Sequence, residues 1–485
     1  MPLHSTRPHR DTEEAEALLA VRPQFAAPEL AKVPRNRLPA GEMAGPTAYQ
    51  IVHDELMLDG NARLNLATFV TTWMDEHAVR LMAECADKNV VDKDEYPQTA
   101  ELERRCVAML ADLWHAPETG AAVGCSTTGS SEACMLAGMA LLHRWRARRD
   151  AGGMPADRPN LLMGANVQVC WEKFCRYWDV EPRLVPCGAE ATHLTPAGAV
   201  AHCDEQTIGV VAVLGSTFDG SYEPVADIAA ALDRLNVQRG LDVPIHVDAA
   251  SGGFVAPFLD PDLEWDFRLR RVQSINASGH KYGLVYPGVG WAVWRDEAAL
   301  PDELVFHVDY LGGDMPTFAL NFSRPGAQVV AQYYTLLRLG FDGYRRVQQS
   351  CRDSARRVAD AVAGMAPFEL LTDGSDLPVV AFRRVERLAR APIGNGGGRG
   401  PGGPGAGRGD WTVYDVSDAL RMRGWLVPAY PMPPALDDVS VLRIVVRNGF
   451  GPDLASLLIE DLRRAVASLE RGGGRADEPR AAFHH

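Results

Sequence analysis

Lys281 is the residue of this chain best placed for covalent chemistry, and it ends the stretch Ser274–Lys281 (SINASGHK). The residues that follow, Gly283–Val285, are small or apolar, which is unusual around a surface lysine. Most lysines are solvated surface charges, and that alternative stays open for any single residue. A lysine in apolar surroundings loses its preference for the charged form, because desolvation disfavours the ammonium. Its neutral amine can then attack a carbonyl carbon and form a Schiff base.

Asp248 follows the strand-like run Ile245–Val247. In open α/β sheets, ligands bind at the carboxyl ends of the strands, so a carboxylate there could face a ligand. The small residues that come next, Ala249–Gly253, leave room for a flat group. The carboxylate could pair with a protonated ring nitrogen. Taken alone, Asp248 fits an N-cap or a structural ion pair better.

The turn Gly129-Ser130-Ser131 opens a helical pattern. Apolar residues follow it with i, i+3, i+4, i+7, i+8 spacing at Ala133, Leu136, Ala137, Ala140 and Leu141. Ser130 is expected to be the N-cap of this helix. Exposed N–H groups, two hydroxyls and the helix dipole would favour a bound phosphate. An ordinary capped helix explains the turn about equally well.

Together the three elements suit a flat, phosphorylated ring that carries an aldehyde and a basic nitrogen. Pyridoxal 5′-phosphate has all of these features, and its enzymes supply a Schiff-base lysine and an acid for the pyridine nitrogen. The coincidence of the three elements is far more specific than any one of them.

The elements that must position these residues alternate between about residues 60 and 340, which predicts an α/β domain with a mainly parallel sheet. Buried strands are expected at Ile208–Leu214, Ile245–Val247 and Val289–Trp294. A smaller unit is expected after about residue 350. Its predicted elements are a helix at Ser350–Met365, strands at Pro378–Phe382 and Val439–Val446, and a helix at Leu454–Leu469.

These patterns divide the chain into an N-terminal arm (1–60), a large domain (61–348) and a small C-terminal domain (349–485). The Gly-rich segment 394–409 is predicted to be a disordered insertion, because it cannot bury apolar surface. It contains a formal Gly-x-Gly-x-x-Gly at Gly398, Gly400 and Gly403. That motif indicates dinucleotide binding only between a strand and a helix, so we reject this interpretation here.

Composition excludes several classes of function. The net charge of −14 disfavours nucleic acid and anionic membrane surfaces as partners. The nine cysteines are scattered without a Cys-x-x-Cys pair, which argues against a disulfide framework and against a bound metal. No apolar run approaches the roughly 18–20 residues of a membrane span, and we find no secretory signal. A cytoplasmic location is therefore expected.

The sequence closely resembles the glutamate decarboxylases of bacterial and plant type, which are group II decarboxylases that depend on pyridoxal phosphate. The resemblance covers about residues 45–470. Its motifs are DELMLDGNARLNLATF (54–69), DKDEYPQTAELERRCVAMLADLWHAP (92–117), GSSEACMLAGMA (129–140), HVDAASGGFVAPF (246–258), SGHKYGL (278–284), ELVFHVDYLGG (303–313), NFSRP (321–325) and LRIVVRNGF (442–450). It implies the aspartate aminotransferase fold (fold type I), with a mainly parallel seven-stranded sheet in the large domain and a smaller α+β C-terminal domain.

The same resemblance implies a role for each matching residue. Lys281 would be the Schiff-base lysine, with Asp248 and His280 as further catalytic residues. The other cofactor contacts would come from Ser130, Ser131 and Ser278 at the phosphate beside His280, Gln168 and Ala250 on the two ring faces, Thr217 near the ring hydroxyl, and Ser323 at the phosphate held by the partner subunit.

For the substrate, the resemblance assigns the distal carboxylate to Thr68, Phe69 (through its backbone), Asn89 and Asp92, and the α-carboxylate to Arg443. Arg443 stands among apolar residues, and a buried arginine needs an anion that its planar fork can bind. Asp92 should repel an acidic substrate unless it is protonated or hydrogen-bonded. This predicts an acidic pH optimum.

The implied activity is decarboxylation of L-glutamate to 4-aminobutanoate (GABA), with one proton consumed, in a homodimer with shared sites or a hexamer. The ending Phe483–His485 resembles a tail in which a histidine closes the site near neutral pH; a frayed end or tag remnant fits equally well. No calmodulin-binding extension is expected. The alternatives are a pyridoxal-phosphate decarboxylase of aromatic amino acids, aspartate or cysteate, a transaminase or desulfurase, and a non-catalytic cofactor-binding protein.

Overall fold

The computed structural model describes residues 36–117, 123–188, 191–308, 315–385 and 411–472. The chain forms two compact units, Met1–Ala62 and Arg63–His485, which we describe separately. In the first unit, α2 (Gly45–Leu56) carries a proline in its first turn and has no buried residue. Proline is tolerated there because the first N–H groups of a helix lack intrahelical partners. The Gly-rich segment 394–409 and the ending 483–485 lie outside the described residues.

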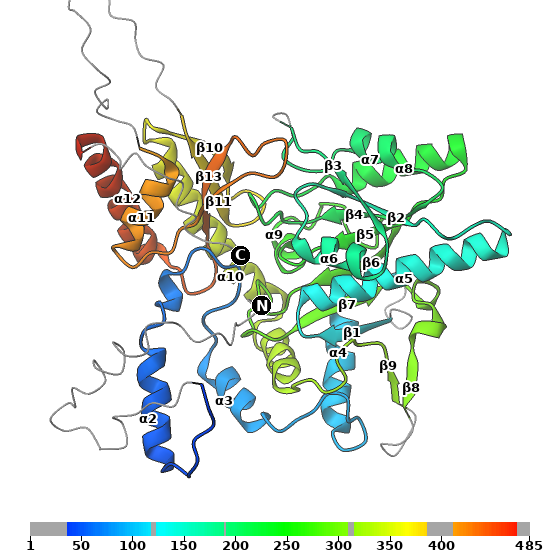
Figure 1. Ribbon diagram of the computed structural model, residues 1–485, viewed down its shortest axis with the longest axis horizontal. Coiled ribbons are helices and arrows are strands. Elements are labelled where there is room, and N and C mark those ends of the chain that lie inside the picture. The colour runs from blue at the N-terminus through cyan, green and yellow to red at the C-terminus, as the bar shows by residue number, and fades with distance from the viewer. Residues whose placement is uncertain (1–35, 118–122, 189–190, 309–314, 386–410, 473–485) are drawn as a thin grey trace, which may run out of the picture. The chain divides into compact units, whose positions relative to one another are not determined.

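A seven-stranded sheet is the centre of the second unit (Figure 1), with the strand order β1-β7-β6-β5-β4-β2-β3. Only β7 runs antiparallel to its neighbours, so the predicted mainly parallel seven-stranded sheet is confirmed. Its strands are β1 (Val123–Thr127), β2 (Asn160–Gly164), β3 (Glu181–Val185), β4 (Thr207–Val213), β5 (Ile245–Asp248), β6 (Val272–Ala277) and β7 (Gly290–Trp294).

Both faces of this sheet are covered, and β4 shows why its sequence is a continuous apolar run. Val211 and Val213 pack into the core formed with α5 (Ser130–Ala151) and α6 (Val169–Tyr177). Val210 and Ala212 pack on the opposite face, in the core that includes α8 (Val225–Arg239). Strands buried on both faces do not alternate between polar and apolar residues. The helices that complete the large part are α3 (Glu76–Glu84), α4 (Pro97–Leu113), α7 (Pro196–His202) and α9 (Ala256–Leu259).

A second, antiparallel sheet follows later in the chain, with the order β10-β11-β13-β12. Its own core is enclosed by α11, α12 and the C-terminal half of α10 (Figure 1). These elements form the smaller α+β part that the sequence predicts. Their bounds are β10 (Phe368–Asp373), β11 (Val379–Arg384), β12 (Ala429–Pro431), β13 (Ser440–Val445), α11 (Val413–Arg421) and α12 (Pro452–Gly472); a separate hairpin pairs β8 (Phe306–Val308) with β9 (Met315–Thr317).

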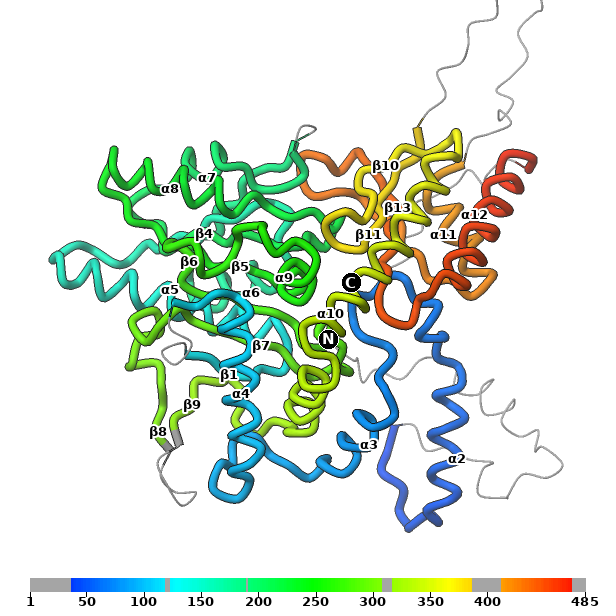
Figure 2. The backbone as a smooth tube through the Cα atoms, turned by 180° about the vertical axis from the view of Figure 1, so that it is seen from behind, coloured from blue at the N-terminus to red at the C-terminus, as the bar shows by residue number. Residues whose placement is uncertain are grey.

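The helix α10 (Ala327–Ala363) runs from the large sheet to the small one, as Figure 2 shows from behind. The expected helix start at Ser350 is wrong, because the helical run begins far earlier. The backbone leaves the helical conformation at Gly340, whose φ of 56° favours glycine. The proposed domain boundary at residue 348 falls within this element and stays a prediction.

The predicted strands of β4, β5, β7, β11 and β13 and the helix of α12 are confirmed within about three residues. The N-cap assignment of Ser130 is wrong. The N-cap is Gly129, and Ser130 is the first helical residue. This shift places the hydroxyl of Ser130 inside the first turn, and no side chain among the described residues caps the open amides of this helix end.

Gly138 packs α5 against α6, since a Cβ at this position would lie 2.5 Å from the ring of Phe174. We expect Gly138→Ala to lower the free energy of unfolding by about 1–3 kcal/mol through overpacking. This expected loss is the net value, after the gain in helix propensity of about 1 kcal/mol that opposes it. Gly364→Ala is the matched control, because a Cβ there has ordinary contacts and the backbone is αR; we expect it to stay within about 0.5 kcal/mol. Equal urea midpoints for the two variants would contradict the packing argument.

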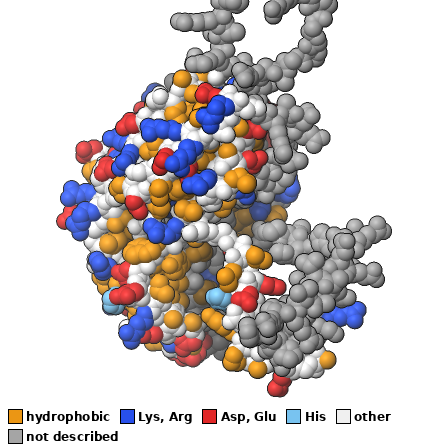
Figure 3. Space-filling view, turned by 90° about the vertical axis from the view of Figure 1, so that its left-hand side faces the viewer, with side chains coloured by type: hydrophobic (Ala, Val, Ile, Leu, Met, Phe, Trp, Pro, Cys, Tyr) orange, Lys and Arg blue, Asp and Glu red, His pale blue; other side chains and the backbone are white. Residues whose placement is uncertain are grey.

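The described surface carries both signs of charge. On the face shown in Figure 3, lysine and arginine side chains are interspersed with aspartate and glutamate, and hydrophobic side chains lie among them. Among the helices in the described ranges, none has the length and apolar character to cross a membrane.

Candidate active site

A cavity of about 260 Å³ opens at the carboxyl ends of β4, β5 and β6, beside the first turn of α5. Parallel strands bring their carboxyl ends to one edge of the sheet, so residues far apart in the sequence meet there. Nine of the residues singled out in the sequence line this cavity: Ser130, Ser131, Gln168, Thr217, Asp248, Ala250, Ser278, His280 and Lys281.

Lys281 stands in the turn after β6, and its Nζ lies 3.3 Å from Ser251 Oγ. Thr71 Oγ1 donates to its backbone carbonyl at 2.5 Å, which fixes the turn. Burial lowers the pKa of Lys281 below its usual value. The nearby charge of Arg443 acts in the same direction, whereas Asp248 opposes it. The site therefore favours the neutral, nucleophilic amine that the sequence predicts.

Asp248 is the last residue of β5 and is almost fully buried. One carboxylate oxygen accepts from Asn276 Nδ2 at 3.0 Å and from the amide of Ala250 at 3.2 Å. The other accepts from Trp171 Nε1 at 2.8 Å and from Cys134 Sγ at 3.7 Å. Four neutral donors satisfy this carboxylate without neutralising it, so its negative charge stays available to a cation in the cavity.

The first turn of α5 forms the far wall. Ser278 Oγ donates to Ser130 Oγ at 2.7 Å, while Ser131 is exposed at the mouth. The first intrahelical bonds are given by the amides of residues 132 and 133, so the preceding amides belong to the open helix end. His280 packs against Gly129, and burial lowers its pKa to about 4, which keeps the imidazole neutral. This wall offers hydroxyls, amides and a neutral imidazole to an anion.

Arg443, from β13, is buried beside the cavity. Its guanidinium donates to the carbonyl of Thr217, which lines the cavity, and to that of Ala67 at 2.6 Å. The guanidinium carbon lies 4.9 Å from the centre of the Phe69 ring, and Lys281 Nζ lies 5.4 Å from the same centre. One aromatic ring thus lies between the guanidinium of Arg443 and the amine of Lys281. Among the described residues, none gives Arg443 a carboxylate partner.

The remaining predicted residues do not line this cavity. Thr68 Oγ1 accepts from the amide of Val70 at 3.1 Å, next to Phe69 in the chain. Asn89 Nδ2 donates to Ser323 Oγ at 3.3 Å, and Asp92 follows in the same loop. Asn89, Asp92 and Ser323 therefore form a second group, which is partly exposed.

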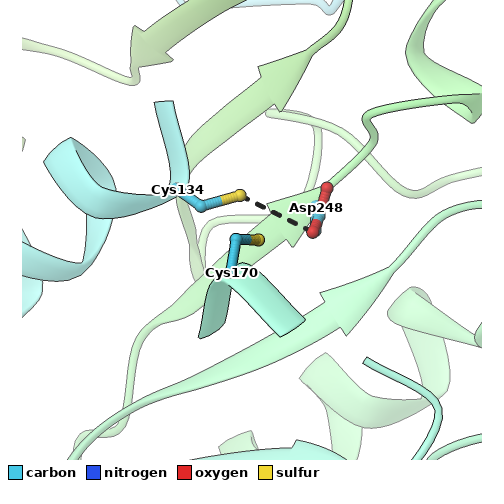
Figure 4. A group of neighbouring side chains, drawn as sticks. All are labelled: Cys134, Cys170 and Asp248. Atoms are coloured by element: carbon cyan, nitrogen blue, oxygen red, sulfur yellow. Dashed lines mark hydrogen bonds between the residues drawn. The ribbon is translucent and has the colours of Figure 1, made fainter. Parts of the chain in front are cut away.

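Cys134 and Cys170 lie beside Asp248, and the three ligand atoms converge within 4.8 Å (Figure 4). Such a set could hold a soft metal ion. The geometry favours a role for Cys134 as a hydrogen-bond donor to Asp248. Its thiol donates to the carboxylate, and burial raises the pKa of that thiol well above the usual value. A protonated thiol is a poor metal ligand.

The comparisons with known proteins agree on one family. The conserved domain of pyridoxal-dependent decarboxylases matches residues 39–385. The chain belongs to the pyridoxal-dependent decarboxylase family. It is 50% identical to the glutamate decarboxylase of Aliivibrio fischeri, over 96% of this chain and 95% of that one. Glutamate decarboxylase beta of Listeria monocytogenes is 46% identical, over 90% of each chain. The structure of Lactobacillus brevis glutamate decarboxylase matches with a TM-score of 0.86 and 45% identity, over 95% of this chain and all of that one.

The cavity fits the cofactor of this family, pyridoxal phosphate. Its lining includes a buried carboxylate for the ring nitrogen, an amine with a lowered pKa for the aldehyde, and an open helix end for the phosphate. These are the three groups that the cofactor needs, arranged around one space.

Several residues of the site were not predicted. Trp171, Asn276 and Ser251 contact Asp248 or Lys281, and Glu132 ties the first turn of α5 to the loop at residues 320–321. Glu132 had a signal in the sequence, because an acid three residues after the N-cap often binds back to the chain before the helix. Asn276 had no signal in the sequence, because its contact with Asp248 depends on the register between β5 and β6.

Proposed function

We propose that this chain decarboxylates L-glutamate to 4-aminobutanoate and CO2 with pyridoxal phosphate and one consumed proton. The observation that carries the proposal is Arg443, a buried guanidinium without a described carboxylate partner, linked through Phe69 to the amine of Lys281. A buried cation needs an anion, and the α-carboxylate of an amino acid is one. Relatives named glutamate decarboxylase, 46–50% identical over nearly the whole chain, support glutamate as the substrate.

Ten residues would hold the cofactor in this proposal. Lys281 would hold the aldehyde carbon, and Asp248 the ring nitrogen. The other contacts would be Ser130, Ser131, Ser278 and His280 at the phosphate, Gln168 and Ala250 on the ring faces, Thr217 near the ring hydroxyl, and Ser323 at the site of the partner subunit. Four hydroxyl groups and a neutral imidazole bind phosphate without adding net charge.

When bound, pyridoxal phosphate supplies an electron sink for the electron pair that the departing carboxyl group leaves on Cα. The residues of the chain make that sink effective. The Asp248 carboxylate would hold a proton on the ring nitrogen, an interaction that strengthens as negative charge develops. Lys281, released as a free amine, would stand close enough to Cα to move a proton. His280 would help to fix the ring through the phosphate.

The substrate would be held at both ends. Arg443 would bind the α-carboxylate with its planar fork, because a bidentate pair fixes direction as well as position. Thr68, the backbone of Phe69, Asn89 and Asp92 would receive the distal carboxylate. Fixing both ends aligns the bond to be broken with the ring system and removes orientational freedom before the reaction.

The second group of residues supports a homodimer with shared sites. Asn89 and Ser323 bind each other and do not line the cavity of their own chain. They could serve in catalysis by reaching the cavity of a second copy. Assembly into a hexamer, the domain boundaries at 60 and 348, and a cytoplasmic location, which the nine free thiols support, are further parts of this proposal.

The test supplies L-glutamate, L-aspartate, L-cysteate and aromatic amino acids separately to the purified holoenzyme. We expect CO2 and 4-aminobutanoate from glutamate, with a preference of at least about 10²-fold over aspartate, which is one methylene shorter and cannot reach both carboxylate sites. Release of CO2 from an aromatic amino acid but not from glutamate would overturn the proposal.

A further inference from the structure

Behind Asp248, away from the cavity, a row of polar side chains crosses from β5 to β6. The parallel register pairs His246 with Ser274 and Asp248 with Asn276. Residues two apart in a strand share a face, so these four side chains lie together. His246, Ser274 and Asn276 are at most 2% exposed, and neither His246 nor Asn276 lines the cavity.

The four groups form one continuous hydrogen-bonded chain. His246 Nδ1 lies 2.8 Å from Ser274 Oγ, and His246 Nε2 lies 2.8 Å from Asn276 Oδ1. Asn276 Nδ2 then donates to Asp248 Oδ1 at 3.0 Å. Trp171 tilts against the imidazole, with ring centres 5.1 Å apart, and donates to the other carboxylate oxygen. A buried network in which every polar group has a hydrogen-bond partner favours a single arrangement of its side chains.

The hydrogen bonds of this row all run in one direction, from donor to acceptor. Asn276 presents its NH2 group to Asp248 and therefore its oxygen to His246, so Nε2 must carry the proton of the imidazole. Burial lowers the pKa of His246 to about 4, and the ring is neutral with that single proton. Nδ1 is then an acceptor, and the hydroxyl of Ser274 donates to it. Every hydrogen bond in the row points toward Asp248.

The opposite direction is incompatible with a charged Asp248. If Nδ1 carried the proton, Nε2 would need a donor, and the Asn276 amide would turn its NH2 group to the histidine. Its oxygen would then face the carboxylate, which Asp248 could tolerate only as a neutral acid. The tautomer of His246 and the charge of Asp248 are therefore linked through Asn276.

We propose that His246 is a positioning residue that, through Asn276, locks Asp248 in its charged form and so holds the ring nitrogen of the cofactor protonated. The proposal rests on the assignment of Asp248 to the ring nitrogen. In this proposal His246 contacts neither the cofactor nor the substrate. It acts through Asn276 and determines whether Asp248 meets the cofactor as a charged carboxylate.

Two amide variants of His246 separate this role from simple packing. The amide nitrogen of His246→Gln can take the place of Nε2 and donate to Asn276, whereas the shorter side chain of His246→Asn reaches only the place of Nδ1. We expect His246→Asn to weaken binding of pyridoxal phosphate to the apoprotein by about 10-fold or more and to change the visible band of the bound cofactor. His246→Gln should keep both close to wild type.

Ser274→Ala is the control, because it removes the bond at Nδ1 and leaves the donor to Asn276 in place; we expect a smaller loss of affinity and an unchanged band. In the wild-type holoenzyme, labelled with ¹⁵N-histidine, we expect the Nε2–H tautomer. Equal behaviour of His246→Asn and His246→Gln, or an Nδ1–H tautomer, would overturn the proposal. Failure of the proposed function would look different: a normal cofactor band without release of CO2 from glutamate.

If His246→Asn does not fold, the tautomer of the wild-type histidine decides the question alone. Asn276→Leu gives a second route that leaves His246 in place, and it should change the cofactor band as His246→Asn does. An unchanged band in Asn276→Leu would also count against the link.

Discussion

Lys281→Ala is expected to lower kcat/KM for glutamate by about 10³-fold or more, the scale of losing a positioned group that reacts or moves a proton. The reason lies in the environment of the amine, since burial lowers its pKa and the turn after β6 holds its backbone through Thr71. In the proposed function, the variant would lose both the attachment to the cofactor and the amine that would move a proton. Steady-state release of CO2, with the cofactor in excess, measures the loss.

Lys173→Ala is the matched control, because Lys173 is an exposed lysine of α6 and should leave activity unchanged. Reduction of the wild-type holoenzyme with borohydride should attach the cofactor to the peptide that contains residue 281, and to no lysine in the Lys281→Ala variant. A variant that kept even a tenth of the wild-type kcat/KM would remove Lys281 from the centre of the mechanism.

Three parts of the cavity lining could be predicted from local sequence patterns, whereas others, such as Gln168 and Thr217, were predicted only through the family resemblance. Asp248 follows a strand, Lys281 follows a short turn, and Ser130 opens a helix, so each short segment carries its own signal. A strand buried on both faces, such as β4, leaves a short apolar run, and the length and β-branched residues of that run favour a central strand over a buried helix. Because parallel strands end at the same edge of the sheet, the polar residues that follow them are expected to lie together there.

What could not be predicted depends on contacts between distant segments. The start of α10 was missed because its first turns mix polar and apolar residues, and packing against α3 and α4 stabilises them. The donor from Asn276 to Asp248 depends on strand register, which a single strand does not specify. Ser130 has the residue type of an N-cap, but Gly129 holds that position.

The meeting of Arg443 and Lys281 also depends on contacts between distant segments of the chain. Arg443 comes from the small sheet, 162 residues after Lys281 in sequence (443 − 281), yet both side chains approach Phe69. Sequence spacing gives no hint of such a meeting. The sequence offered two signs that the charge of Arg443 binds an anion: its apolar neighbours in the chain and the resemblance to the decarboxylase family.

Arg443→Lys is expected to lower kcat/KM for glutamate by about 10²-fold, mainly through a higher KM. Breaking a buried charge pair costs about 2–5 kcal/mol, and each 1.4 kcal/mol is about tenfold. Lysine keeps the charge but not the planar fork, so it cannot bind the α-carboxylate through two parallel hydrogen bonds. It also cannot bond to the carbonyls of Thr217 and Ala67 while turning a second pair of donors to the substrate.

Arg383→Lys, on the neighbouring strand β11, is the control for Arg443→Lys. Arg383 forms a surface ion pair with Glu369 at 2.7 Å and is 41% exposed, so we expect its replacement to leave KM within about twofold. The cofactor band and the urea midpoint of Arg443→Lys separate a binding role from a structural one. A normal band with a raised KM supports carboxylate binding, because the cofactor contacts remain. An unchanged KM, with loss only of stability, would show that the buried guanidinium serves the carbonyls and the rings around it, and the α-carboxylate would then need another cation.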